Sequence, residues 1–272
     1  MQVEFTKAVA SGNDFVILNN FGNKYRDLKT RFADFARFVC HRRFSIGADG
    51  LLVLEASKKA DFKMRIFNPD GREVSMCGNG IRVSAVCAYE NNLAGEKMKI
   101  ETLAGALAAE INGQSVKVKM TEPKNVKIDQ NIGVESSIVN MHSVDTGVPH
   151  AIHFVDNIED YPVKKIGELV RRHKVFEPEG TNADFVKIID PSTIEVRTYE
   201  RGVEDETLAC GTGIVASAVI ANIVHDVSQP VSVLTKSKET LKVYFRKERD
   251  VFKDVYFEGK AFIVFKGVLD YV

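Results

Sequence analysis

Cysteine is scarce in this sequence of 272 residues, and its four copies are widely spaced. No two of them form a Cys-x-x-Cys pair, which argues against a structural zinc site and against a thioredoxin-type redox site. The N-terminus lacks the apolar run of a signal peptide, so we expect a cytoplasmic protein in which disulfides are disfavoured. Cys40 and Cys87 fall on helix-like stretches, where a buried, unreactive thiol is the simplest interpretation.

An excess of charge of either sign is also lacking. Lys and Arg together number 37, and so do Asp and Glu. Because no basic block stands out either, the composition argues against a nucleic-acid partner and against binding to an anionic membrane. The longest mainly apolar run, residues 214–224, is too short to span a bilayer. The expected ligand is therefore a small molecule, and a hydrophobic content of 44% suffices for a packed core in one or two domains.

A ten-residue segment that begins at Cys77 recurs almost half a chain later, beginning at Cys210. Residues 77–86 read CGNGIRVSAV and residues 210–219 read CGTGIVASAV, so seven of the ten positions are identical. A repeat with this spacing indicates two copies of one structural unit. Each copy places a cysteine and two glycines ahead of an apolar, helix-like run. A thiol at a helix N-terminus lies in the positive end of the helix dipole, which favours the thiolate.

Strand-like and helix-like runs follow in a similar order in both halves. The expected strands are residues 3–9, 15–19, 50–55, 62–67, 98–102, 106–111 and 115–120 in the first half, and 137–144, 151–155, 183–189, 193–199, 231–234, 241–245 and 255–257 in the second. Further helices are expected near residues 32–39 and 164–173. The second copy of the repeat is apolar on nearly every side, so its helix must be buried on every side.

These patterns predict an α/β (α+β) fold with two pseudo-symmetric domains. Each domain is expected to be a curved, mostly antiparallel sheet wrapped around a central helix, with the active site in the cleft between the domains. The segment Thr121-Glu122-Pro123-Lys124 interrupts the strand pattern and marks the predicted crossover. We predict one domain over residues 1–118, completed by a strand at residues 262–272, and the other over residues 119–261.

Two thiols that face one bound amino acid can invert its α-carbon. One thiolate removes the α-proton from one face while the opposite thiol donates a proton to the other face, and each group contributes roughly 10²–10⁴-fold as a general acid or base. The N–H groups at Gly78-Asn79 and at Gly211-Thr212 suit the negative charge that develops on the α-carboxylate. Because the sequence carries no pyridoxal phosphate or metal motif, we expect neither a cofactor nor a metal.

The two cysteine motifs resemble the paired active-site motifs of the diaminopimelate epimerase family. Five further segments resemble landmarks of that family in the same order: Gly12-Asn13-Asp14-Phe15-Val16, Phe67-Asn68-Pro69-Asp70-Gly71, Thr146-Gly147-Val148-Pro149-His150, Asn182-Ala183-Asp184-Phe185 and Tyr199-Glu200-Arg201-Gly202. The resemblance covers almost the whole chain. It implies a two-domain fold, a cytoplasmic homodimer, and conversion of LL- to meso-diaminopimelate without pyridoxal phosphate, in lysine and cell-wall synthesis.

The same resemblance implies roles for particular residues. Cys77 and Cys210 would be the two acid/base thiols, and His150 and Glu200 would lie beside the reacting centre and assist the proton transfers. The groups expected to hold the reacting carboxylate are Gly78, Asn79, Gly211 and Thr212. The groups expected to hold the distal end of the substrate are Asn13, Asn68, Asn182 and Arg201. Arg201 is the expected partner of the distal carboxylate because its guanidinium binds bidentately.

Two positions depart from the pattern of many relatives. Val148 stands where many carry Asn, and Gly50 stands where some carry a substrate-contacting Gln. Neither position adjoins the thiols, so the departures concern recognition of the distal end and not the reaction type.

Two other functions stay open. One is another cofactor-independent two-cysteine racemase, which would act on proline, hydroxyproline or histidine. The other is a non-catalytic binding module on the same fold. Proline racemases usually carry His where Asn79 stands, and non-catalytic relatives lack the cysteines.

Overall fold

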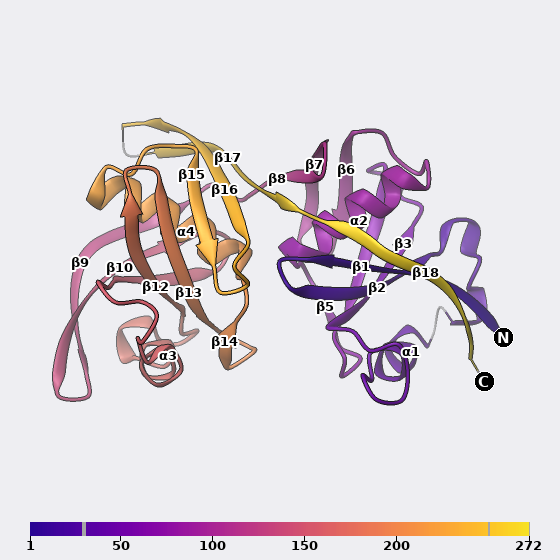
Figure 1. Cartoon of the computed structure of the whole chain (residues 1–272), viewed down its shortest axis with the longest axis horizontal. Helices are drawn as coiled ribbons and strands as arrows, with labels where there is room; N and C mark the ends of the chain where they lie inside the picture. Colours follow the sequence, from indigo (N-terminus) through magenta and orange to yellow (C-terminus); the bar gives the residue numbers. More distant parts are fainter. Residues whose placement is uncertain (29–30, 250, 272) are drawn as a thin grey trace. The chain divides into compact units, whose positions relative to one another are not determined.

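The protein is described by a computed structural model that covers residues 1–28, 31–249 and 251–271. Contacts divide the chain into two compact units (Figure 1). Unit 1 comprises Met1–Val118 together with Gly259–Val272, and unit 2 comprises Lys119–Glu258. No helix in the described part of the chain is both long enough and apolar enough to cross a membrane.

Unit 1 surrounds one helix with strands. Its strands are β1 (Gln2–Ala10), β2 (Asn13–Asn19), β3 (Gly50–Glu55), β4 (Phe62–Phe67), β5 (Glu73–Val74), β6 (Lys97–Thr102), β7 (Gly105–Asn112), β8 (Ser115–Lys119) and β18 (Phe262–Asp270). Its helices are α1 (Phe32–Val39) and α2 (Gly78–Glu90), with short 3-10 turns η1 (Phe21–Asn23) and η2 (Arg26–Leu28). The central helix α2 contacts β1, β2, β3, β4, β6, β7 and β18.

Unit 2 is built in the same way. Its strands are β9 (Lys124–Val134), β10 (Ser137–Asp145), β11 (Pro149–Phe154), β12 (Asn182–Asp190), β13 (Thr193–Glu200), β14 (Asp205–Thr207), β15 (Val231–Thr235), β16 (Thr240–Glu248) and β17 (Val251–Lys260). Its helices are α3 (Val163–Arg171) and α4 (Gly211–His225), with the 3-10 turn η3 (Lys174–Phe176). The central helix α4 contacts β10, β11, β12, β13, β15 and β16.

The strand pairings of the two units match step by step. In unit 1, β18, β1 and β2 are antiparallel neighbours, β2 is parallel to β3, β3 is antiparallel to β4, β4 is parallel to β6, and β6, β7 and β8 are antiparallel. Unit 2 repeats this succession as β9, β10, β11, then β12, β13, then β15, β16, β17. The short strands β5 and β14 pair with β4 and β13 and precede α2 and α4. The sequence repeat at the cysteines is therefore a repeat of topology.

The central helices form because their residues are buried on all sides. In α4 every residue from Gly213 to Ala221 is buried, as the apolar sequence requires. Helix α1, by contrast, buries one stripe, formed by Phe32, Phe35, Ala36 and Val39, against the outside of β3 and β4. The predicted α/β fold, with a mostly antiparallel sheet around a central helix in each half, is confirmed.

One long strand, β9, was not predicted from the sequence. The predicted crossover at residues 121–124 leads directly into β9, which pairs with β10 over residues that we had not expected to be extended. Among its residues only Ile132 and Val134 are buried, and Asn125 and Asp129 adopt positive φ angles of 56° and 55°. Asn and Asp have a low strand propensity, and bulges interrupt the alternation of side chains, so the local sequence does not predict a strand here. Pairing with β10 stabilises the extended conformation.

The chain's last strand belongs to unit 1. β18 runs antiparallel to β1, with Val3 opposite Leu269 and Phe5 opposite Gly267. The strand had been expected over residues 262–272, and its final residue, 272, lies outside the described residues. β18 thus returns to the first-half strands after the chain has completed unit 2 (Figure 1, yellow).

Candidate active site

Cys77 and Cys210 occupy equivalent positions, at the N-caps of α2 and α4. Both have extended backbones, with φ and ψ of −148° and 121° for Cys77 and −110° and 111° for Cys210. Neither thiol caps its helix, and the first helical hydrogen bonds run from Ile81 N to Cys77 O and from Ile214 N to Cys210 O, each 2.9 Å long. The N–H groups of the first turn, which include those of Gly78 and Gly211, thus have no acceptor within the helix. Each unit presents a thiol beside an anion-binding helix end.

A chain of polar contacts connects Cys210 to a buried histidine in unit 2. The Cys210 Sγ lies 3.4 Å from the Thr212 hydroxyl, which lies 2.9 Å from Nε2 of His150. Nδ1 of His150 lies 2.6 Å from a carboxylate oxygen of Asp184, and both side chains are fully buried. The Thr198 hydroxyl donates to the other oxygen of Asp184 at 2.6 Å. Parallel pairing of β11 with β12 places His150 beside Asn182, two residues before Asp184.

Asn182 determines which nitrogen of His150 accepts a proton. The Oδ1 of Asn182 accepts from the Arg201 backbone N–H at 2.7 Å, so its Nδ2 is the end that faces His150 Nε2 at 3.3 Å and Pro149 O at 3.2 Å. An amide nitrogen only donates, so Nε2 is an acceptor and Nδ1 carries the proton that faces Asp184. In this arrangement Nε2 of His150 accepts hydrogen bonds and is directed at the Thr212 hydroxyl.

The environment of Cys210 favours the thiol form. Burial, together with the carboxylates of Glu200 and Asp184, raises the pKa of Cys210 well above its usual value. Burial also raises the pKa of Glu200. The expectation that the helix N-terminus makes this cysteine a thiolate is wrong for Cys210, because desolvation and two nearby carboxylates outweigh the helix dipole. At neutral pH Cys210 is therefore a thiol.

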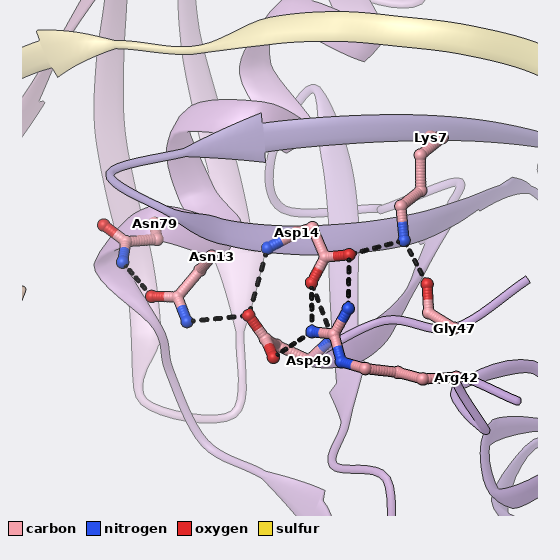
Figure 2. A network of polar contacts seen from close by, with 7 residues as sticks. All are labelled: Lys7, Asn13, Asp14, Arg42, Gly47, Asp49 and Asn79. Atoms are coloured by element: carbon pink, nitrogen blue, oxygen red, sulfur yellow. Dashed lines mark hydrogen bonds and ion pairs between the residues drawn. The ribbon is translucent and has the colours of Figure 1, made fainter. Parts of the chain in front are cut away.

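In unit 1 the corresponding half-site contains Cys77, Asn79 and Asn13. Cys77 is half-buried, whereas Asn79 is buried in the first turn of α2. The Nδ2 of Asn79 donates to Oδ1 of Asn13, at the start of β2, and the Nδ2 of Asn13 donates to Asp49 at 3.1 Å (Figure 2). Asn13, expected at the distal end of the substrate, therefore adjoins a residue expected at the reacting carboxylate.

The other predicted site residues lie at strand ends. Asn68 follows β4 and begins a turn, in which its backbone N–H donates to the carbonyl oxygen of Arg72 at 2.9 Å. Arg201 follows β13, and its guanidinium donates to the carbonyl oxygen of Glu179 at 3.2 Å. Gly50 begins β3, where a Cβ atom would lie 3.1 Å from the carbonyl oxygen of Phe67. That close approach limits the space for a side chain at the position where some relatives carry Gln.

Sequence analysis missed several polar residues that complete these half-sites. They are Asp184 and Thr198 in unit 2, and Asp49 and Arg82 in unit 1. The sequence contained a hint of two of them. Asp184 shares a strand face with Asn182, and Arg82 is a charged residue at the repeat position that Val215 occupies in the second copy. Among the described residues, no group of three or more His, Cys, Asp or Glu side chains is arranged to hold a metal ion.

We expect alkylation to distinguish the four cysteines. Iodoacetamide at pH 7.5 should modify Cys77 first, because the thiolate is the nucleophile and Cys77 is the most accessible of the four thiols. Burial raises the pKa of Cys40 to about 12 and that of Cys87 to about 11, and it raises the pKa of Cys210 as well. Peptide mass spectrometry at increasing times gives the order of modification, and denatured protein, in which all four thiols react, is the control. Equal rates for Cys77 and Cys210 would contradict this assignment.

Comparison with known proteins places the chain in a family. The sequence model of the family described as "Diaminopimelate epimerase" matches residues 5–126 and 142–261. A diaminopimelate epimerase from Aquifex aeolicus (strain VF5) is 41% identical over 276 residues, which cover 98% of this chain and 98% of that protein. In fold, the chain is similar to a phenazine biosynthesis protein of the PhzF family from Bacillus anthracis (TM-score 0.74, 17% identity, 100% of both chains covered). It is also similar to a probable proline racemase from Agrobacterium radiobacter K84 (TM-score 0.69, 14% identity, 99% and 93% covered). The extent and level of the sequence match show that this chain belongs to the diaminopimelate epimerase family.

Proposed function

We propose that this protein is an isomerase that converts LL-2,6-diaminopimelate to meso-diaminopimelate, in lysine and peptidoglycan-precursor biosynthesis. The observation that carries the proposal is the pair of cysteines at the N-caps of two equivalent helices, Cys77 on α2 and Cys210 on α4, in a chain of this family. The reaction needs a base on one face of the α-carbon and an acid on the other, and a duplicated unit supplies one thiol from each copy.

The proposed reaction transfers two protons and needs no pyridoxal phosphate or metal. One cysteine, as thiolate, takes the α-proton and becomes a thiol. The other, as thiol, gives its proton to the opposite face of the α-carbon and becomes a thiolate. Charge that builds on the α-carboxylate in the transition state is stabilised by the N–H groups at Gly78-Asn79 and Gly211-Thr212, which are fixed before the substrate binds. The α-carbon leaves with inverted configuration.

The contacts around Cys210 support a role for His150 and Glu200 in proton handling. The Nε2 of His150 accepts from the Thr212 hydroxyl, and that hydroxyl lies beside the Cys210 thiol. We infer that His150 draws on the Cys210 proton through Thr212, while burial and the Glu200 carboxylate keep the pKa of Cys210 high. Together these groups allow a buried thiol to change protonation state at each turnover.

Arg201 is proposed to recognise the distal carboxylate of diaminopimelate, and Asn68 and Asn182 complete that end of the site. Replacement of Arg201 by Ala or Lys should lower kcat/KM by about 10- to 100-fold, because a charge-assisted hydrogen bond contributes about 1.5–3 kcal/mol and Lys lacks the planar fork. Lysine, which has no second carboxylate, should be a poor substrate of the wild type. Initial rates on both compounds provide the measurement.

Arg172→Ala is the matched control for Arg201. Arg172 is an exposed arginine of the same unit, 3.7 Å from Glu168, and its loss should leave kcat/KM unchanged. If Arg201→Ala turned over diaminopimelate as well as the wild type does, the assignment of the distal carboxylate to Arg201 would be wrong.

Exchange of the substrate α-proton in deuterated water tests the function itself. Purified protein is incubated with LL-diaminopimelate, lysine, proline, trans-4-hydroxyproline and histidine, and the α-proton signals are followed by NMR. We expect exchange in diaminopimelate alone. Exchange in proline or histidine but not in diaminopimelate would make the protein another two-cysteine racemase, and exchange in none of them would indicate a binding module.

We further propose that the protein acts in the cytoplasm as a homodimer. Strand β18 carries exposed apolar side chains, among them Phe262, Val264 and Val268, each more than half exposed. Apolar side chains gathered on one strand favour burial against a second copy. Light scattering should give about twice the 30.3 kDa mass of the chain, and Val264→Lys combined with Val268→Lys should shift the mass toward that of the monomer. A monomeric wild type at micromolar concentration would contradict this proposal.

A further inference from the structure

A chain of hydrogen bonds in unit 1 runs in a single direction through both asparagines of the half-site. Arg82 donates to Oδ1 of Asn79 at 2.5 Å. Asn79 then donates to Oδ1 of Asn13, and Asn13 donates to Oδ2 of Asp49 at 3.1 Å. The residues come from α2, from β2 and from the segment before β3, so the chain depends on the tertiary fold (Figure 2).

The two ends of this chain are charged groups of opposite kind. Arg82 is fully buried and also donates to the Ser11 hydroxyl at 2.6 Å and to the Lys260 carbonyl oxygen at 2.9 Å. At the other end, Asp49 forms an ion pair with Arg42 at 2.6 Å. A guanidinium only donates hydrogen bonds and a carboxylate only accepts them. The ends therefore fix the direction of every bond between them.

A second aspartate anchors the acceptor end. Asp14 contacts Arg42 at 2.7 Å and Lys7 at 2.8 Å, and its side-chain oxygen accepts from the Asp49 backbone N–H at 3.2 Å. Burial alone would favour protonated Asp14, but the hydrogen bonds and charges of Arg42 and Lys7 hold the pKa of Asp14 well below its usual value. The cations of Arg42 and Lys7 and the carboxylates of Asp14 and Asp49 form one network of ion pairs, which holds the segment that carries Asp49 (Figure 2).

The direction of the chain determines what the two amides offer to a ligand. Each amide uses its oxygen to accept from the residue before it and one N–H to donate to the residue after it. An amide NH₂ has two N–H donors and an amide oxygen has two lone pairs, so each side chain has one donor and one acceptor beyond those used in the chain. The direction of the chain fixes on which side of each amide, beside Cys77, that donor and that acceptor lie.

We propose that Asp49 and Arg82 are positioning residues that hold the amides of Asn13 and Asn79 in one fixed orientation toward the substrate. The inference rests on the proposed function, because it takes these asparagines to contact the substrate. Asp49 acts on the substrate through Asn13, and Arg82 acts on it through Asn79. Neither residue exchanges a proton with the substrate.

Asp49→Asn tests the inference while it preserves the shape of the side chain. The variant can turn an NH₂ toward Asn13 and loses the ion pair with Arg42, so the direction of the chain is no longer fixed. We expect kcat/KM for LL-diaminopimelate to fall by about tenfold or more, mainly through KM. Asp34→Asn is the matched control, since Asp34 pairs with Arg37 at the same 2.6 Å on the exposed face of α1, and it should behave as wild type.

NMR supplies a readout that does not depend on turnover. In protein labelled with ¹⁵N-asparagine, the side-chain NH₂ signals of Asn13 and Asn79 should shift and broaden in Asp49→Asn but not in Asp34→Asn. If the wild type epimerises diaminopimelate, yet Asp49→Asn keeps kcat/KM within twofold and leaves both NH₂ signals in place, the inference is overturned and the proposed function stands. If the wild type exchanges no α-proton of diaminopimelate, the proposed function fails, and unmoved NH₂ signals would then overturn the positioning role as well.

Discussion

Replacement of either Cys77 or Cys210 by Ala is expected to abolish epimerisation, with kcat reduced at least about 1,000-fold. Each direction of the reaction uses one thiol as base and the other as acid, so a single loss stops both directions. General acid or base groups contribute roughly 10²–10⁴-fold each, and the methyl group of alanine cannot exchange a proton. The loss of stability should be small for Cys77, which is only half-buried.

The other two cysteines are internal controls for this result. Cys40 and Cys87 are buried in unit 1 with raised pKa values, and Cys40 belongs to the hydrophobic core beneath α1. Cys40→Ala and Cys87→Ala should therefore reduce stability modestly through lost packing and leave turnover close to that of the wild type. Turnover is followed by the decay of the α-proton signal in deuterated water. Near-normal turnover in either Cys77→Ala or Cys210→Ala would contradict the two-base scheme.

The duplicated architecture was accessible from the sequence because burial and periodicity act locally. Residues 214–224 are apolar on nearly every side of the helix, which predicted that strands surround it. α4 is surrounded by strands in this way. The i, i+3, i+4, i+7 spacing of apolar residues predicted a helix near residues 32–39, and α1 confirms it. β9 was not accessible, since its stability comes from register with β10 and not from its own Asn- and Asp-containing sequence.

For the site, sequence identified the residues with distinctive local chemistry and missed those whose role depends on tertiary contacts. The cysteines are marked by the glycines that follow them and by their repetition. The role of Asp184 becomes visible only when β11 and β12 pair in parallel, which brings it to 2.6 Å from His150. Arg82 was visible as a charge in a buried helix, but its partner Ser11 lies 71 positions away in the sequence.

The two copies of the repeat also carry glycines that look equivalent in sequence and differ in space. A Cβ atom on Gly213 would lie 2.4 Å from Oδ1 of Asp184 and 3.2 Å from Cε1 of His150, distances that require the neighbours to move. A Cβ atom on Gly80 would meet nothing closer than 3.4 Å, from a methyl group of Leu52. The first turn of α4 is therefore pressed against the His150–Asp184 pair, whereas the first turn of α2 has room for a methyl group.

Gly213→Ala is expected to lower the free energy of unfolding by about 1–3 kcal/mol, the usual cost of overpacking, and to lower kcat by about 100-fold or more. The methyl group pushes Asp184 away from Nδ1 of His150, so the imidazole loses the contact that aligns it with Thr212. Gly80→Ala should be neutral or stabilising by up to about 1 kcal/mol, since alanine favours a helix over glycine and no clash opposes it. Denaturant unfolding of both variants and kcat of Gly213→Ala provide the test. A Gly213→Ala protein with the stability of Gly80→Ala and wild-type turnover would show that the close contact of α4 with Asp184 is not needed to hold the histidine. In that case the chain of contacts from Asp184 to Cys210 would lose its proposed role in proton transfer.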